Sequence, residues 1–214
     1  MVLADVTLRQ YFNMIVSAKV HITPEMISVD GQPVFKADDL LKDAYRSLGI
    51  DHPKFYKMDQ LSKLGLLSVE YLIGKTKVNE RYNDDEIALV FNNRDASAGS
   101  DLEHQKAFNI GHASPSIFVY TLPNIVLGEI AIRNKWYGEQ LCTVSDQPNI
   151  GSLYQHCLTL MNKGKAKAII LLNINSIEDK FEARTLLIEK DGIHEGIPFS
   201  MEMLNQLFKE DARS

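Results

Sequence analysis

The stretch from 114 to 160 constrains the fold of this 214-residue chain most strongly. It opens with Ser-Pro, which disfavours helix at the residue before the proline, and it continues as an apolar segment over Thr121–Ile132. Tyr137-Gly138 ends that segment, and Leu141–Ser145 has the composition of a short strand. Asp146-Gln147-Pro148-Asn149 is then a tight turn into another helix. A strand, a sharp turn and a helix are how α/β proteins hold one side chain at the carboxyl end of a strand.

The residue at the tip of this predicted turn is Gln147. Its side chain is a neutral amide, which is neither a nucleophile nor a practical base at neutral pH. The sequence therefore predicts a place for a nucleophile that is filled by a residue unable to act as one.

The same stretch resembles the nucleophile-bearing half of the β-ketoacyl-acyl-carrier-protein synthases, which belong to the thiolase-like superfamily. The matching residues are Ser114-Pro115, Pro123-Asn124, Gly128, Gly138 and the triplet Ser145-Asp146-Gln147, which occupies the position of the family's Thr-Ala-Cys. Glutamine in place of that cysteine is typical of chain length factors, the non-nucleophilic partners in iterative polyketide and aryl-polyene synthases. The resemblance is strongest from Met58 to Ile188.

The resemblance implies that residues 1–214 form a single ketosynthase N-terminal-like domain. The fold class that it implies is α/β, as one three-layer α/β/α half of the thiolase-like duplication with a five-stranded mixed sheet. A complete synthase fuses two such halves, and the second half supplies two catalytic histidines and a lysine. This sequence matches the first half, so the resemblance assigns it neither the cysteine nor those histidines.

Composition and charge narrow the classes of partner. The chain has 45% apolar and 24% charged residues, close to the average for globular proteins, and one domain is the default at its length. Its 23 basic against 28 acidic residues give a net charge of −5, whereas nucleic-acid binding needs a basic stripe. No apolar run approaches the roughly 20 residues of a membrane span, and the N-terminus lacks a signal-peptide pattern. The two cysteines are too few for a disulfide scaffold, so we expect a cytoplasmic protein.

Hydrophobic patterns along the chain predict alternating strands and helices. The predicted strands span residues 14–22, 86–91, 141–145, 165–174 and 183–189, and a hairpin over Ile27–Phe35 closes at Asp30-Gly31. The predicted helices are Ala37–Leu48, Met58–Ile73, Pro123–Asn134, Asn149–Asn162 and Phe199–Phe208. We interpret the polar, small-residue segment Asn92–Asp101 as a loop at the carboxyl end of a buried strand, where α/β sheets often form ligand sites.

Other chemistry-bearing residues have simpler interpretations. Cys142 and Cys157 are expected to be packing residues, and His156 beside Cys157 cannot face it on a helix. His104 and His112 flank the Ser-Pro entry, where a solvated role is the more common one. The sequence has no glycine-rich phosphate loop and no metal-ligand spacing, so we expect no cofactor and no metal site.

The resemblance also names candidate functional residues. The candidate acyl-pocket or tip residues are Ser145, Asp146, Gln147, Asn124 and Phe118. Families with this fold dimerise by pairing the strand before the nucleophile across a two-fold axis, so the candidate dimer interface is Leu141, Cys142, Thr143, Val144 and Ser145. An unpaired edge of this kind is prone to aggregation in a monomer.

Three functions remain open on this basis. The leading hypothesis is a catalytically silent, chain-length-factor-like subunit of bacterial fatty-acid, polyketide or aryl-polyene biosynthesis, paired with an active 3-oxoacyl-acyl-carrier-protein synthase or with itself. The second is a minimal synthase, malonyl-carrier decarboxylase or acyltransferase that is active as a homodimer. The third is a module that binds an acyl chain or an acyl carrier protein.

Overall fold

The computed structural model of the chain describes residues 14–111, 115–190 and 195–209. Ser114, His112 and His194 lie outside these residues. The strands are β1 (Met14–Ile22), β2 (Ile27–Val29), β3 (Gln32–Phe35), β4 (Ile87–Asn93), β5 (Gln140–Val144), β6 (Ala168–Ile177), β7 (Lys180–Lys190) and β8 (Ile197–Pro198). The helices are α2 (Leu40–Leu48), η1 (Pro53–Lys57), α3 (Gln60–Thr76), α4 (Val78–Arg81), α5 (Ala98–Asn109), α6 (Pro115–Val119), α7 (Ile125–Asn134), α8 (Ile150–Asn162) and α9 (Met201–Lys209).

A single mixed sheet runs through the molecule in the order β3-β2-β1-β7-β6-β4-β5, and β8 pairs with β1. β4 runs parallel to both β5 and β6, whereas β7 is antiparallel to its neighbours β6 and β1. The five strands predicted from sequence therefore form the centre of the sheet. The expected number of five was wrong, because the hairpin β2–β3 and the short β8 extend the sheet to eight strands on the side of β1.

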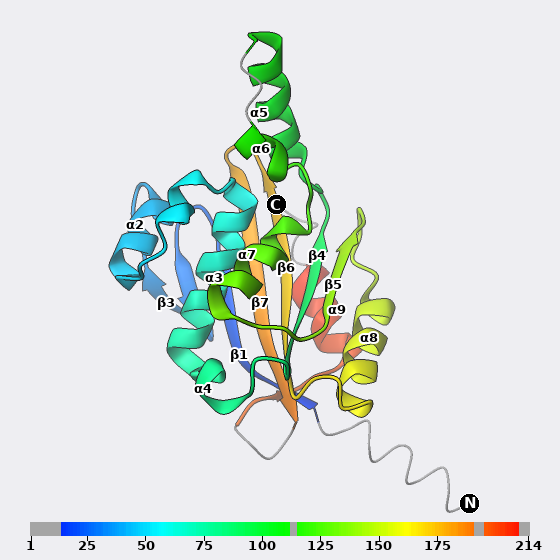
Figure 1. Cartoon of the computed structure of the whole chain (residues 1–214). Coiled ribbons are helices and arrows are strands. Elements are labelled where there is room, and N and C mark those ends of the chain that lie inside the picture. The colour runs from blue at the N-terminus through cyan, green and yellow to red at the C-terminus, as the bar shows by residue number, and fades with distance from the viewer. Residues whose placement is uncertain (1–13, 112–114, 191–194, 210–214) are drawn as a thin grey trace, which may run out of the picture.

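Helices cover both faces of this sheet, so the predicted three-layer α/β/α arrangement is confirmed (Figure 1). One hydrophobic core joins α2, α3 and α7 to one face, and a second core joins α8 and α9 to the other. β4 is buried along its whole length, and β6 is buried from Ala168 to Ile174, as near-continuous apolar strands with covered faces should be.

The segment Asn92–Asp101 is not the loop that its composition predicts. β4 continues through Asn92 and Asn93, and α5 begins at Ala98. Both asparagines remain in the buried strand with their amide N–H groups bonded: Asn92 donates to Asn173 Oδ1 at 2.8 Å and Asn93 to the Ala96 carbonyl at 3.1 Å, although Asn93 Oδ1 has no partner among the described residues. Composition alone does not reveal such pairing.

The ends of the elements follow ordinary helix and turn chemistry. Asp59 caps α3 by accepting a bond from the Ser62 amide at 2.9 Å, and Gly49 ends α2 with φ 61°. The predicted hairpin turn is confirmed, with Asp30 at φ 51° and Gly31 at φ 80° in the left-handed region that a two-residue connection uses.

Glu189 is fully buried on β7 and ties three elements together at the amino end of β1. Arg81 and Tyr82, which bracket the end of α4, donate to its carboxylate at 2.5 and 2.7 Å, and Ser17 of β1 donates as well. Burial alone would raise the pKa of this carboxyl, but the three hydrogen bonds outweigh it and the pKa is lowered. The charged form is therefore the stabilising one, and its contribution is lost as the pH falls through the lowered pKa.

Among the described residues, no helix combines the length and the apolar character that crossing a membrane requires.

Two glycines of α3 provide a matched test of the packing between α3 and α7. A Cβ at Gly65 would lie 2.3 Å from Val126 Cγ2 of α7, whereas one at Gly74 would meet nothing within 4 Å. We expect Gly65→Ala to lower the free energy of unfolding by about 1–3 kcal/mol, because the stiff Val126 side chain must move. Gly74→Ala should instead raise it by about 0.5–1 kcal/mol through helix propensity. Urea denaturation of both variants is the measurement, and equal effects of the two would contradict the close approach.

Candidate functional site

The turn that follows β5 is built as the sequence predicts. The Ser145 amide continues the ladder by donating to the Asn93 carbonyl at 3.0 Å, and the Ser145 hydroxyl donates to the Gln147 carbonyl at 2.9 Å. Asn149 then caps α8 by accepting from the Ser152 amide at 3.0 Å. These bonds leave the Gln147 side chain exposed at the tip of the turn.

A polar ladder connects the three parallel strands just below this turn. Thr143 of β5 donates to Asn92 Oδ1 of β4 at 3.0 Å, and Asn92 in turn donates to Asn173 of β6. Each of these pairs stands in direct register across the sheet, so the side chains share the face that carries α8 and α9. The ladder therefore ties the edge strand β5 to the centre of the sheet.

Above the ladder lies a small hollow of about 40 Å³. Its lining comes from the carboxyl ends of the parallel strands, the turn and the last turn of α9: Asn92, Arg94, Asp146, Gln147, Pro148, Asn173, Asn175 and Phe208. A space of this size holds water molecules rather than an acyl chain. Amide and guanidinium groups dominate the lining, and none of the residues lining it offers a thiol or a hydroxyl that could hold an acyl chain.

The structure separates the predicted tip residues into two groups. Asp146 and Gln147 meet at the hollow, and Ser145 holds the turn above it. Phe118 is instead exposed on α6, with its ring 5.6 Å from that of His104, and Asn124 is exposed at the start of α7. Neither Phe118 nor Asn124 lines the hollow.

Neither cysteine is placed to act as a nucleophile at the turn. Cys157 is fully buried in α8, and this burial raises the pKa of its thiol to about 12. Cys142 is half-buried within β5, and burial raises its pKa too. His104 belongs to α5, and the described residues contain no group of three or more His, Cys, Asp or Glu side chains suited to a metal ion.

No strand in the described part of the chain pairs with the outer edge of β5, so this edge is open. Because Leu89 donates to the Glu139 carbonyl and Ser145 donates to Asn93, the odd-numbered residues of β5 face β4. The N–H and C=O groups of Gln140, Cys142 and Val144 therefore point away from the sheet, and the Val144 side chain is 48% exposed.

The two edges of the sheet differ in how they are protected. β3, at the other end, is a four-residue strand that contains Pro33 and follows a register shift in its pairing with β2. Proline and irregular pairing are devices that keep an edge from adding strands. β5 has none of these devices, and no lysine either. The open edge of β5 is thus a ready site for strand pairing.

Exposed apolar side chains gather in the part of the chain that leads into β5. Nine of the thirteen large ones in the described residues lie between Leu102 and Val144: Leu102, Phe108, Ile110, Phe118, Val119, Leu122, Ile132, Tyr137 and Val144. We call α5, α6 and the described residues beside these two helices the arm. The first five residues of this list belong to the arm. Figure 1 shows the arm projecting beyond the carboxyl ends of the strands. Apolar exposure concentrated in this way is typical of a protein interface.

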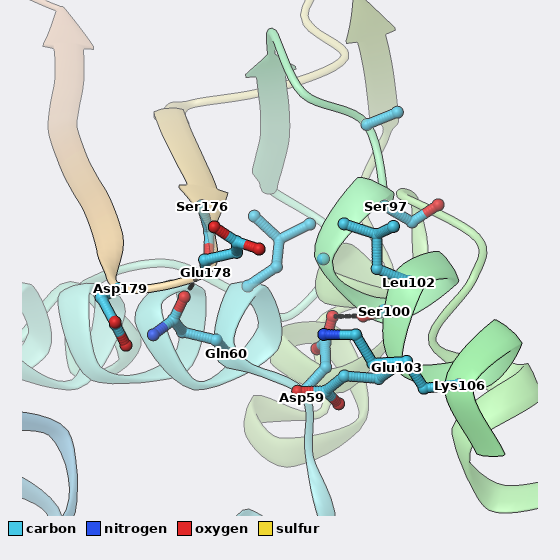
Figure 2. A pocket seen from close by; sticks show the side chains of 13 residues that line it. Asp59, Gln60, Ser97, Ser100, Leu102, Glu103, Lys106, Ser176, Glu178 and Asp179 are labelled. Carbon is cyan, nitrogen blue, oxygen red and sulfur yellow. Dashed lines mark hydrogen bonds between the residues drawn. The ribbon is translucent and has the colours of Figure 1, made fainter.

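A larger groove of about 530 Å³ lies at the root of the arm, on the α3 side of the sheet. Figure 2 shows that its polar lining comes from the start of α3, from α5 and from the β6–β7 turn: Asp59, Gln60, Ser97, Ser100, Glu103, Lys106, Ser176, Glu178 and Asp179. The sequence indicated only one part of this groove: Ser97 and Ser100 belong to Asn92–Asp101, the segment interpreted as a loop at a strand end where ligand sites often form. The capping residue Asp59 was a possible signal, but only the fold brings it beside α5 and the β6–β7 turn.

Sequence reasoning also missed a buried polar cluster between α7 and η1. Glu129 is 3% exposed; its Oε1 accepts from Lys54 at 2.7 Å and from the Tyr120 hydroxyl at 3.1 Å, while its Oε2 has no partner among the described residues. His52 Nε2 is likewise buried without a partner in the described part of the chain, and burial followed by the nearby Arg133 charge lowers the pKa of His52. The cluster fixes the end of the arm to α7.

Comparisons with known proteins bear on the fold. No family model matches the sequence, and no curated protein matches it either. Solved structures do. A chain of the complex between the ketosynthase ApeO and its chain length factor ApeC from Xenorhabdus doucetiae has a TM-score of 0.58 at 13% identity, covering 86% of this chain and 80% of that one.

Two further structures give the same result. The ishigamide ketosynthase/chain length factor has a TM-score of 0.64 at 13% identity, covering 87% of this chain and 64% of that one. AntDE:AntF, a type II PKS acyl-carrier protein in complex with its ketosynthase bound to the hexaketide, has a TM-score of 0.63 at 12% identity, with shares of 84% and 63%. This chain thus spans just under two thirds of these two relatives. It has the thiolase-like fold of ketosynthases and chain length factors, as the sequence resemblance predicted.

The polar ladder gives a test of how β5 is held. Thr143→Val keeps the shape of the side chain but removes the donor to Asn92 Oδ1, so a buried acceptor loses a partner. We expect the free energy of unfolding to fall by about 1–3 kcal/mol. Thr143→Ser, which keeps the hydroxyl, is the matched control, and its free energy of unfolding should fall by less. Chemical denaturation measures the free energy of unfolding of both variants. A Thr143→Val variant as stable as the native chain would show that the ladder does not hold the strand.

Proposed function

We propose that this chain is a catalytically silent, chain-length-factor-like subunit that pairs with an active ketosynthase of the same fold. The observation that carries the proposal is the open edge of β5 leading directly into a turn whose tip is Gln147. The edge supplies a surface for a partner, and the tip has no nucleophile of its own.

The chemistry of condensation supports a silent role. A ketosynthase must hold the growing acyl chain as a thioester and must stabilise the enolate that forms when the malonyl group loses carbon dioxide. The Gln147 amide cannot form the thioester. The described histidines do not reach the hollow beside the turn, so no imidazole is placed there to stabilise an enolate.

The pairing that we propose joins β5 to the equivalent strand of the partner in an antiparallel manner. The outward N–H and C=O groups of Gln140, Cys142 and Val144 would make the new ladder. Side chains of residues directly opposite one another must lie on the same face of the continuous sheet. Because side chains alternate between the faces along a strand, the two-fold axis must pass level with a residue, such as Cys142 or Thr143, rather than between two residues. Exposed Ile132 and Tyr137, which precede β5 in the chain, are candidates for additional apolar contact with the partner.

The solved structures support the choice of partners. They include ketosynthases with their chain length factors and a ketosynthase with its acyl carrier protein. We accordingly propose an active ketosynthase as the partner and an acyl carrier protein as the carrier of the substrate, in cytoplasmic fatty-acid, polyketide or aryl-polyene biosynthesis. The sequence run KGKAK at residues 163–167 is basic and could contact an acidic carrier, but two of its lysines lie near carboxylates. Lys167 Nζ is 2.5 Å from Glu86 Oε1, and Lys165 Nζ is 4.0 Å from Glu139 Oε1. We therefore place carrier docking on the partner subunit.

Proline at an outward-facing position tests the proposed pairing. Val144→Pro removes an N–H that points away from β4, so the chain's own ladder is preserved while the partner loses a donor. We expect at least a tenfold loss of affinity for a ketosynthase that copurifies with the native chain, measured by calorimetry with purified proteins.

Val144→Thr, which keeps the N–H, is the control and should bind nearly as the native chain does. Labelling of the Cys142 thiol provides a second readout, because pairing should slow it in the native complex. Full affinity of a folded Val144→Pro chain would contradict the proposal.

Activity measurements separate the silent subunit from a minimal enzyme. Purified alone with malonyl- and acyl-loaded carrier proteins, the native chain should release no 3-oxoacyl product. Gln147→Cys should not restore turnover, because the variant supplies a thiol but the described residues place no enolate-stabilising imidazole beside the turn. Mass spectrometry of the carrier-bound products is the measurement. Condensation by the isolated native chain would favour the homodimeric enzyme instead.

A further inference from the structure

The arm is a pair of helices with almost no core of its own. In α5, a helix of twelve residues, the one buried side chain is Ser100. Phe108 is 61% exposed and Ile110 72% exposed, and Phe118 on α6 is 59% exposed. A helix of this length is marginal in water unless packing holds it. The arm therefore exposes apolar surface that the described part of the chain does not cover.

The root of the arm is nevertheless firmly fixed. Ser97 donates to the Thr121 carbonyl at 2.5 Å and so joins the two ends of the arm. Ser100 donates to Asp59 Oδ2 at 2.7 Å, which anchors α5 to the start of α3. The buried Tyr120 donates to Glu129 of α7. With these anchors the arm has a defined direction, as a surface that meets a partner requires.

The groove beside this root is acidic. Four carboxylates line it, from Asp59, Glu103, Glu178 and Asp179, against one lysine, Lys106. None of these four makes an ion pair with another residue in the described part of the chain. Unlike the carboxylate of Glu189, which Arg81 neutralises, they present a net negative field toward the base of the arm.

One of these carboxylates is held in an unfavourable backbone conformation. Glu178 lies in the two-residue turn between β6 and β7 with φ 52°, a region in which glycine is far less strained. The turn would form more easily with glycine, so a glutamate at this place costs stability that folding alone does not require.

We infer that the arm and the acidic groove at its root form a second docking surface, which selects a basic, non-identical ketosynthase-fold partner over a second copy of this chain. This inference rests on the proposed function. The occupant is a segment of the partner with an apolar face for the arm and lysine or arginine side chains for the groove. A second copy is disfavoured because it carries the same net charge of −5 and the same acidic groove.

Affinity measurements with a separately purified ketosynthase that copurifies with the native chain test the inference at low and high salt. Phe108→Ser combined with Ile110→Ser should weaken binding at least tenfold, because hot-spot apolar contacts are lost. Glu103→Gln combined with Glu178→Gly should weaken binding about three- to tenfold at low salt and much less at high salt, because screening removes the attraction.

Controls distinguish binding effects from loss of folding. Glu178→Gly should keep or raise the melting temperature, since glycine suits φ 52°, so its weaker binding cannot be attributed to unfolding. Val34→Ser on β3 and Glu80→Gln on α4 remove an exposed apolar group and an exposed charge elsewhere, and they should change affinity less than about twofold.

The outcomes separate this inference from the proposed function. If Val144→Pro abolishes pairing while the arm and groove variants bind as the native chain does, the inference is wrong and the pairing through β5 stands. If Val144→Pro also binds normally, both fail. Self-association of the native chain as tight as its binding to the ketosynthase at low salt would refute the selection against a second copy.

Discussion

The hydrogen-bonded ladder Thr143–Asn92–Asn173 is the constraint on which the functional end of the molecule depends. β4 is buried along its whole length, so a polar side chain within it is tolerated only with a partner. The ladder provides that partner and thereby fixes β5 against β4 in one register. This register determines where the turn at Ser145–Gln147 lies and in which direction the open edge of β5 faces.

The parts of the fold that follow from local chemistry were predictable. β1, the helices α3, α7 and α8, and the strand-turn-helix around Gln147 follow from periodic apolar residues and from turn or cap residues at their ends. The family resemblance rested on the same local features, and the comparison with solved structures agrees with it at the level of the fold.

The parts that depend on contacts distant in sequence were not predictable. The helix α5 lacks a buried face, so no periodicity marks it, and only its first residues, up to Asp101, fall within the segment interpreted as a loop. The acidic groove joins Asp59, Glu103 and Glu178, which only the folded chain brings together. No sequence pattern predicts the Glu129 cluster either, because an isolated glutamate in a helix is usually solvated.

The unequal edges of the sheet have a consequence for stoichiometry. A sheet that could accept strands on both sides would polymerise, since every added chain would offer a fresh template. Here Pro33 and the irregular pairing of β3 block one side, so growth is possible in a single direction from β5. The proposed pairing at β5 would use that direction, and strand addition would then stop at a complex of two chains.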